Sequence, residues 1–184
     1  MARIAIIGDG PGGLSAALFL AKNGHEALVY GDDKSAVRFA QLHNYLGLPD
    51  IAGPDFIAIA RAHTKSHGAH FLDERARDVV PSPTGFSVIS DSDGTEDVDY
   101  VVLDEGKNPV IAGALGLEVD DSGAVSVDSE QRTGFPRVYA VGRMTRPKRS
   151  QVVISAGAGA VAALDILATE AGEDLQDWDT PPKD

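Results

Sequence analysis

The 184-residue chain contains no cysteine, which excludes disulfide bonds, thiolate metal sites and dithiol redox chemistry. Any redox activity must therefore come from a bound cofactor. No apolar stretch approaches the length that we expect of a membrane-spanning helix. The amino-terminal segment "MARIAIIGDG" also lacks the long apolar middle of a secretory signal. We expect a cytoplasmic protein that does not bind a membrane.

Basic residues are scarce as well, with 16 Lys and Arg against 28 Asp and Glu and a formal net charge of −12. So acidic a surface disfavours nucleic acid and anionic lipid. An Asp-rich, Lys-poor composition suits a salt-rich cytoplasm, where ions screen the self-repulsion of the chain. We expect a halophilic source, with an acidic mesophile protein as the alternative.

The order of apolar runs predicts one α/β domain. A short strand, a glycine turn and a helix in "ARIAIIGDGPGGLSAALFLAKNG" lead to a second strand in "HEALVYGDD", which predicts a right-handed βαβ unit with parallel strands. Short β-rich runs follow at 69–105, then the strand "RVYAVG" and a long Ala/Gly-rich helix. We expect a single Rossmann-like domain with a central parallel sheet and a small antiparallel β-meander over residues 1–172, followed by a polar C-terminal tail at 173–184.

The glycine turn has the spacing Gly8-x-Gly10-x-x-Gly13 between a strand and a helix, which is the context that a dinucleotide-binding loop requires. Gly8 permits the tight turn, Gly10 leaves room for a pyrophosphate, and Gly13 lets helix and strand pack closely. The helix then presents its N–H groups to the anion. The alternative is a glycine turn that binds no ligand.

The second strand of such a unit normally ends in an acid that binds the adenosine ribose. Here Gly31 occupies that position, and Asp32 and Asp33 come one and two residues later. Either aspartate reaches the ribose if the strand end is shifted. Otherwise both are solvated turn residues.

Four segments together resemble the FAD domain of the thioredoxin reductase family: the glycine loop with its flanking strands, "NYLGLPDIAGPDFI", "RTGFPRVYAVG" and "SQVVISAGAGAVAALDIL". The residues that match the family's strand motif are Thr133, Pro136, Val138, Tyr139, Ala140 and Gly142. The resemblance implies an FAD cofactor, with Gln151 and Val152 opening a helix beside the flavin ring.

The chain departs from that family in three places. The family inserts an NAD(P)H domain with a Cys-x-x-Cys pair after the meander, whereas "DYVVLDEGKNPVIAG" runs straight on here. The family's Ala-Thr-Gly is replaced by residues Asp104 to Gly106. Arg143 stands where the family has the Asp that binds the ribityl chain of the flavin.

Arg143 begins a basic cluster with Arg146, Lys148 and Arg149. By the resemblance, this cluster falls beside the FAD pyrophosphate, where Arg143 would make charge-assisted hydrogen bonds to phosphate. The alternatives are an ion pair between Arg143 and Asp9 or simple exposure of Arg143. For the other three residues, a solvated loop is favoured over a site.

The candidate cofactor-binding residues are Gly8, Gly10, Pro11, Gly12, Gly13, Asp32, Asp33, Gly142, Arg143, Ser150, Gln151 and Val152. No catalytic residue can be assigned. His63 and His67 share a helix face near His70, but without an acidic or thiolate partner at fixed spacing we expect no metal site.

The resemblance and the departures predict a minimal FAD-binding flavoprotein that exchanges electrons with an external reductant and is not a thioredoxin reductase on its own. The alternatives are a non-catalytic nucleotide-binding or interaction module, and the FAD subunit of a split reductase. We expect a homodimer with an unidentified redox partner protein or small-molecule reductant.

Overall fold

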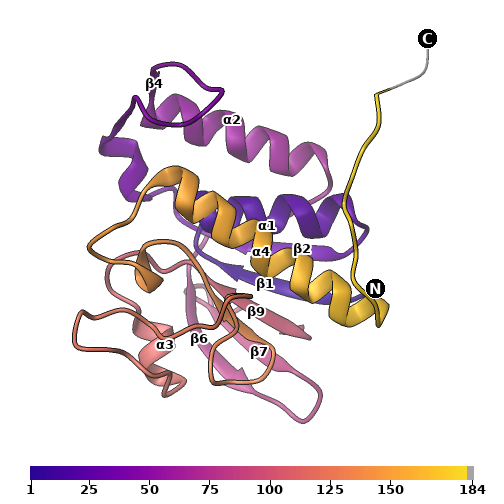
Figure 1. The fold of residues 1–184 in the computed structure, drawn as a ribbon. Helices are drawn as coiled ribbons and strands as arrows, with labels where there is room; N and C mark the ends of the chain where they lie inside the picture. Colours follow the sequence, from indigo (N-terminus) through magenta and orange to yellow (C-terminus); the bar gives the residue numbers. More distant parts are fainter. Residues whose placement is uncertain (182–184) are drawn as a thin grey trace.

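A five-stranded parallel sheet forms the centre of the computed structural model, which describes residues 1–181 (Figure 1). The strand order is β10-β9-β1-β2-β5. The strands are β1 (Arg3–Ile7), β2 (Glu26–Tyr30), β5 (His70–Phe71), β9 (Tyr100–Leu103) and β10 (Val138–Ala140). Helix α1 (Pro11–Lys22) joins β1 to β2, which pair in parallel. The predicted α/β class and βαβ unit are therefore confirmed.

Three helices cover one face of this sheet: α1, α2 (Gly53–Ser66) and α4 (Val152–Ala171) (Figure 1). Ile4 and Ile6 of β1 are fully buried in the core beneath α1 and α4. Small residues let these two helices approach closely, since a Cβ on Gly159 would lie 3.0 Å from the Ala16 nitrogen. The Ala/Gly composition of α4 thus places its first turn beside the glycine loop.

A second, antiparallel sheet covers the other face, in the order β6-β7-β8. Its strands are β6 (Ala76–Pro81), β7 (Phe86–Ser90) and β8 (Thr95–Val98). Alternate residues of β1, Ala5 and Ile7, share a core with Phe86 and Val88 of β7. The predicted meander is therefore confirmed, and it forms the third layer of the domain.

The short elements lie in the connections. They are η1 (Ala36–Phe39), the paired strands β3 (Gln41–Leu42) and β4 (Ile51–Ala52), α3 (Val110–Ala114) and η2 (Gly142–Thr145). Helix α4 ends at a left-handed Gly172 (φ 76°), and residues 173–181 form no helix or strand. The last three residues of the predicted tail, 182–184, lie outside the described residues, and the domain boundary at 172 remains a prediction.

Helix α4 corrects one expectation, because it is long and apolar enough to span a membrane by length and composition alone. A core helix of a globular domain passes the same test. Ala162, Ala163 and Ile166 of α4 are fully buried in the domain. The helix also holds a buried carboxylate, Asp165, which accepts hydrogen bonds from Tyr139 and Arg132. These contacts pack one face of α4 against the core of the fold.

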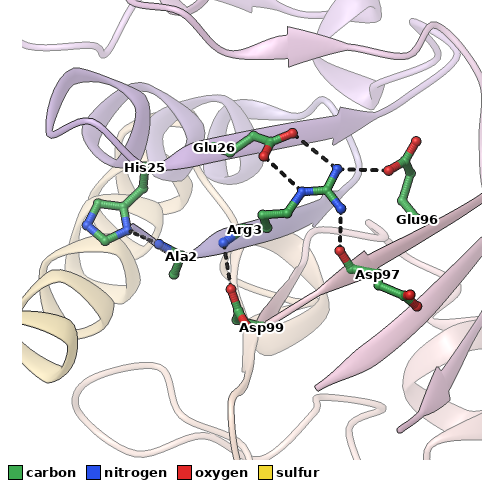
Figure 2. A network of polar contacts seen from close by, with 7 residues as sticks. All are labelled: Ala2, Arg3, His25, Glu26, Glu96, Asp97 and Asp99. Atoms are coloured by element: carbon green, nitrogen blue, oxygen red, sulfur yellow. Dashed lines mark hydrogen bonds and ion pairs between the residues drawn. The ribbon is translucent and has the colours of Figure 1, made fainter. Parts of the chain in front are cut away.

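Arg3 joins several strands at the amino edge of the central sheet (Figure 2). Its guanidinium donates to the carboxylates of Glu26 on β2 and Glu96 on β8, and to the carbonyl of Asp97. The Arg3 backbone N–H donates to the Asp99 carboxylate at 2.8 Å. These bonds raise the pKa of Arg3 further above its usual value, so this edge binds the two sheets together through paired charges.

Candidate functional site

A cleft of about 920 Å³ opens at the opposite, carboxyl edge of the sheet. It lies where β1 has β2 on one side and β9 on the other, which is the topological switch point at which open α/β sheets bind ligands. The predicted site residues that line it are Gly8, Gly10, Pro11, Asp32, Arg143, Ser150, Gln151 and Val152. The fold therefore gathers residues from four separate segments around one space.

Gly12 and Gly13 do not line the cleft but lie buried in the first turn of α1. The N–H of Gly13 donates to Oδ2 of Asp104 at 2.8 Å, and the nearby N–H of Gly12 also favours the charged form of this carboxylate. Asp104 is the residue after β9, and it is 9% exposed. An internal carboxylate therefore caps α1 at the point where a phosphate was expected.

The glycine loop is shaped around this carboxylate. A Cβ on Gly10 would lie 2.6 Å from Asp104 Oδ2. Gly142 has a left-handed backbone (φ 73°), and a Cβ there would overlap Asp104 Oδ1. Larger residues at either position would displace the Asp104 side chain.

Burial raises the pKa of Asp104 to about 7, because the folded chain removes water from the charged form. The hydrogen bonds from Gly13 and Gly12 oppose this effect, and the nearby charge of Asp9 adds to it. Asp104 therefore changes its charge near neutral pH, which an exposed aspartate does not do.

Asp9 pairs with Arg61 of α2, so the alternative in which Asp9 forms an ion pair with Arg143 is wrong. Oδ2 of Asp9 lies 2.5 Å from the Arg61 guanidinium and accepts the N–H of Asp33. Burial raises the pKa of Asp9, and the charge of Arg61 opposes that rise. A Cβ on Gly31 would lie 2.8 Å from Asp9 Oδ2. The glycine at the expected ribose position thus makes room for Asp9.

Asp32 and Asp33 separate at the end of β2. Asp32 lines the cleft, and its carboxylate lies 2.6 Å from Lys34 Nζ, which lowers the pKa of Asp32. Asp33 has a left-handed backbone (φ 59°) and pairs with Arg38. Of the two predicted ribose acids, Asp32 is the one that the structure places on the cleft.

Arg143 lines the cleft and forms no ion pair with any of residues 1–181. Lys148 lines the cleft too, whereas Arg146 and Arg149 are exposed residues outside it. The basic residues that line the cleft are Lys34, Arg75, Arg77, Lys107, Arg143 and Lys148. The acidic ones are Asp9, Asp32, Asp91, Asp104 and Glu105. A chain with a net charge of −12 therefore has a cleft in which basic side chains outnumber acidic ones.

The amino end of α4 forms one rim of the cleft. Gln151 is the N-cap residue of α4, and its side-chain oxygen accepts a hydrogen bond from Asn44 at 3.0 Å. Ser150 and Val152 flank it on the same rim. The Asn44–Gln151 bond links this rim to the loop after β3 across the cleft.

No group of His, Asp or Glu suitable for a metal ion occurs among residues 1–181. The rings of His63 and His67 lie 4.9 Å apart on α2 in an edge-to-face arrangement, and both residues are exposed.

Asp104 and Glu105 were not predicted as site residues, although their replacement of Ala-Thr was visible in the sequence. Glu105 accepts the N–H groups of Ile111 and Ala112 and so caps α3, and burial raises the pKa of Glu105. The sequence feature that could have identified Asp104 and Glu105 as site residues is their position directly after an apolar strand. If that strand is parallel to β1, its carboxyl end must lie beside the glycine loop.

A parallel sheet with a glycine loop at its switch point, and a cleft at its carboxyl edge, defines a dinucleotide-binding α/β domain. The pyridine nucleotide-disulphide oxidoreductase family matches residues 44–160, and the chain belongs to this family. Its members are flavoproteins that typically bind FAD. The chain has no cysteine and therefore lacks a redox dithiol of its own.

Curated relatives are longer than this chain. Trypanothione reductase from Trypanosoma congolense is 28% identical over 167 residues, which cover 79% of this chain and 34% of that protein. Dihydrolipoyl dehydrogenase from Bacillus subtilis is 34% identical over 74 residues, covering 36% of this chain and 16% of that protein. The chain thus spans about a third of the first relative and less of the second.

Solved structures share the fold at low sequence identity. A thioredoxin reductase from Gloeobacter violaceus superposes with a TM-score of 0.89 at 15% identity, covering 97% of this chain and 99% of that chain. An atypical thioredoxin reductase from Desulfovibrio vulgaris Hildenborough gives a TM-score of 0.84 at 18% identity, covering 94% and 99%. These similarities establish a thioredoxin reductase-like architecture.

Proposed function

We propose that this chain binds FAD in the carboxyl-edge cleft and acts as a flavoprotein oxidoreductase that receives its electrons from outside the chain. The observation that carries the proposal is the cleft itself, which gathers the glycine loop, Asp32, Arg143 and the start of α4 around one space. Its volume of about 920 Å³ lies at the upper end of the range for ligand pockets. Its basic side chains suit a cofactor that carries two phosphates.

The residues present fit FAD by donor type. The guanidinium of Arg143 and the ammonium of Lys148 would hold the pyrophosphate over Gly8 and Gly10, while the carboxylate of Asp32 would accept from the adenosine ribose. On the α4 rim, Gln151 and Val152 would contact the flavin ring. Bound FAD would supply the electron-transfer chemistry, and these residues would orient it and shield it from water.

The proposed external reductant follows from the course of the chain after β9. The chain passes from β9 directly to α3, and residues 1–184 contain neither a second glycine fingerprint nor a cysteine. Nothing in the chain would then orient a nicotinamide against the flavin. We expect the pure, FAD-loaded protein to be reduced by NADH or NADPH slowly or not at all; rapid stoichiometric bleaching of the flavin would contradict this.

The cofactor itself is tested by releasing it. Purified protein is denatured and the supernatant analysed for flavin and nicotinamide nucleotides, and stripped protein is titrated with FAD, FMN and NAD. We expect FAD to be released or to rebind most tightly. Release of nicotinamide nucleotide alone, or tight NADH binding without affinity for FAD, would overturn the proposal.

A second candidate function, a non-catalytic nucleotide-binding or interaction module, is favoured by one observation. Asp104 already occupies the α1 donors that would otherwise meet a phosphate. Colourless protein that FAD cannot reconstitute at any pH would support this candidate over the first.

We also propose that the chain forms a homodimer and works with a separate redox partner, as expected of a flavin domain without its neighbouring domain. Phe39 and Leu46 are more than nine-tenths exposed, and apolar surface of this kind favours association. Light scattering in high salt tests the dimer, and a monomer at all concentrations would contradict it.

A further inference from the structure

We infer that Asp104 is the resident anion of the glycine loop, and that a dinucleotide phosphate reaches the amino end of α1 only when this carboxylate is protonated or displaced. The part of the inference that concerns the phosphate rests on the proposed FAD binding. The part that concerns the carboxylate rests on the contacts of Asp104 alone.

The backbone donors of α1 leave no other arrangement. Pro11 has no N–H, and the N–H of Leu14 already donates to the Gly10 carbonyl at 2.9 Å. Gly12 and Gly13 are the remaining donors of the first turn. The N–H of Gly13 donates to Asp104 Oδ2 at 2.8 Å, and the N–H of Gly12 favours the charged form of the same carboxylate, which lowers its pKa. A phosphate that approaches α1 therefore finds the N–H groups it would need occupied by a buried carboxylate.

Two anions cannot share these donors at low cost. An ionised carboxylate beside a pyrophosphate is a like-charge contact in a site with little water, which strongly disfavours one of the two charges. A protonated Asp104 would remove the repulsion and could donate a hydrogen bond to a phosphate oxygen. The pKa of about 7 that burial gives to Asp104 puts this change within the physiological range.

Other charged groups face the same cleft and must be separated from Asp104 in any test. On the side of β2 and β3 they are Asp9 in the glycine loop, Asp32 and Lys34 after β2, and His43 after β3. From the antiparallel sheet they are Arg75 before β6, Arg77 in β6 and Asp91 after β7. The others are Glu105 and Lys107 after β9, and Arg143 and Lys148 after β10. His43 is a titratable side chain on the cleft and therefore has its own control variant. Glu105 is the matched acid, since its carboxylate caps α3 instead of α1.

The first experiment measures the FAD dissociation constant by flavin fluorescence between pH 5.5 and 8.5 at fixed salt. In the unmodified protein we expect FAD affinity to fall roughly tenfold for each pH unit above about 7, as required when one proton must be bound. Asp104→Asn should remove this slope and bind FAD on the order of 30-fold more tightly at pH 8.5. Glu105→Gln and His43→Gln should retain the slope.

An FAD affinity independent of pH in the unmodified protein, or a slope that survives in Asp104→Asn, would overturn the inference. If only Asp104→Asn binds FAD, the inference is supported in its strongest form, because the Asp104 carboxylate then excludes the cofactor from the unmodified protein.

A second experiment needs no cofactor. The backbone amide resonances of Gly12 and Gly13 are followed by NMR against pH in the unmodified protein and in Asp104→Asn. We expect both amides to shift with a midpoint near pH 7 in the first and to stay constant in the second. Constant amides in the unmodified protein would overturn the resident carboxylate. If the amides shift with pH but no variant binds FAD, the contact between Asp104 and α1 is supported and the proposed FAD binding is refuted.

Discussion

The two edges of the central sheet differ in how their charged side chains are partnered. At the amino edge the Arg3 guanidinium meets the carboxylates of Glu26 and Glu96 (Figure 2). At the carboxyl edge Asp104 meets backbone N–H groups, and Arg143 forms no ion pair within residues 1–181. Paired charges hold layers together, whereas perturbed and uncompensated charges in a cleft are typical of a functional site. The contrast indicates that the amino edge serves stability and the carboxyl edge serves binding.

The largest effect is expected for Asp104→Asn on the free energy of unfolding. The pKa of Asp104 rises from 3.8 to about 7 on folding, so between these values the folded chain holds a proton that the unfolded chain has lost. The free energy of unfolding of the unmodified protein therefore falls as the pH rises from about 4 to about 7. Asp104→Asn lacks this loss and should be more stable above pH 7 by up to about 4 kcal/mol, the equivalent of roughly three pH units.

Urea unfolding at several pH values and fixed salt measures this difference. The two proteins should have similar stability near pH 4 and diverge as the pH rises. Parallel curves across the whole range would show that Asp104 is not a proton-binding group of the folded state.

Arg143→Ala should have the next largest effect, on cofactor binding. Loss of hydrogen bonds from a charged group to phosphate should weaken FAD binding by about 1.5–3 kcal/mol, roughly 10- to 150-fold, with the fold intact. Arg149→Ala is the matched control, because Arg149 is exposed and does not line the cleft. Equal FAD affinity in both variants would leave Arg143 without a phosphate contact.

Arg3→Gln should lower the stability of the fold through the amino edge of the sheet, without an effect on the cleft at the carboxyl edge. The Arg3 side chain is 35% exposed, so solvent weakens its ion pairs, and we expect a loss of only about 1–2 kcal/mol in the free energy of unfolding. FAD affinity should not change. A loss of FAD affinity without a loss of stability would contradict the separation of roles between the two edges.

The smallest effect should distinguish the two aspartates after β2. Asp32→Asn should weaken FAD binding by about 1 kcal/mol, roughly fivefold, through a weaker hydrogen bond to the ribose. Asp33→Asn should leave it unchanged, because Asp33 pairs with Arg38 outside the cleft lining. The reverse order, measured by the same fluorescence titration, would place the ribose against Asp33.

Local sequence patterns were sufficient for the fold class and for the position of the cleft, but not for the packing of the meander against one face of the central sheet. The apolar run of β1 and the glycine spacing after it are short-range features, and they predicted the strand, the turn and the start of α1. The carboxyl ends of parallel strands meet at one edge, so Gly8, Asp32 and Arg143 could be expected around one cleft although they are far apart in the chain.

The charge contacts within that cleft could not be predicted. Asp104 follows its strand as an ordinary turn aspartate would, and nothing local shows that its carboxylate turns inward to Gly13, 91 residues away. Asp9 likewise has Arg61 as its partner across 52 residues. Such pairs depend on how helices and loops pack in three dimensions, which periodicity does not describe.

The connection from β9 to β10 has a consequence for protein engineering. The two strands are neighbours in the sheet, so their pairing does not depend on how much chain lies between them, and longer loops add little free energy, about 0.6 kcal/mol per doubling of length. Gly106 and Lys107 follow the strand at the surface, just before α3. Because Gly106 and Lys107 also line the cleft, a folded module spliced there, such as one that binds a nicotinamide nucleotide, would be attached next to the cleft without interrupting a strand.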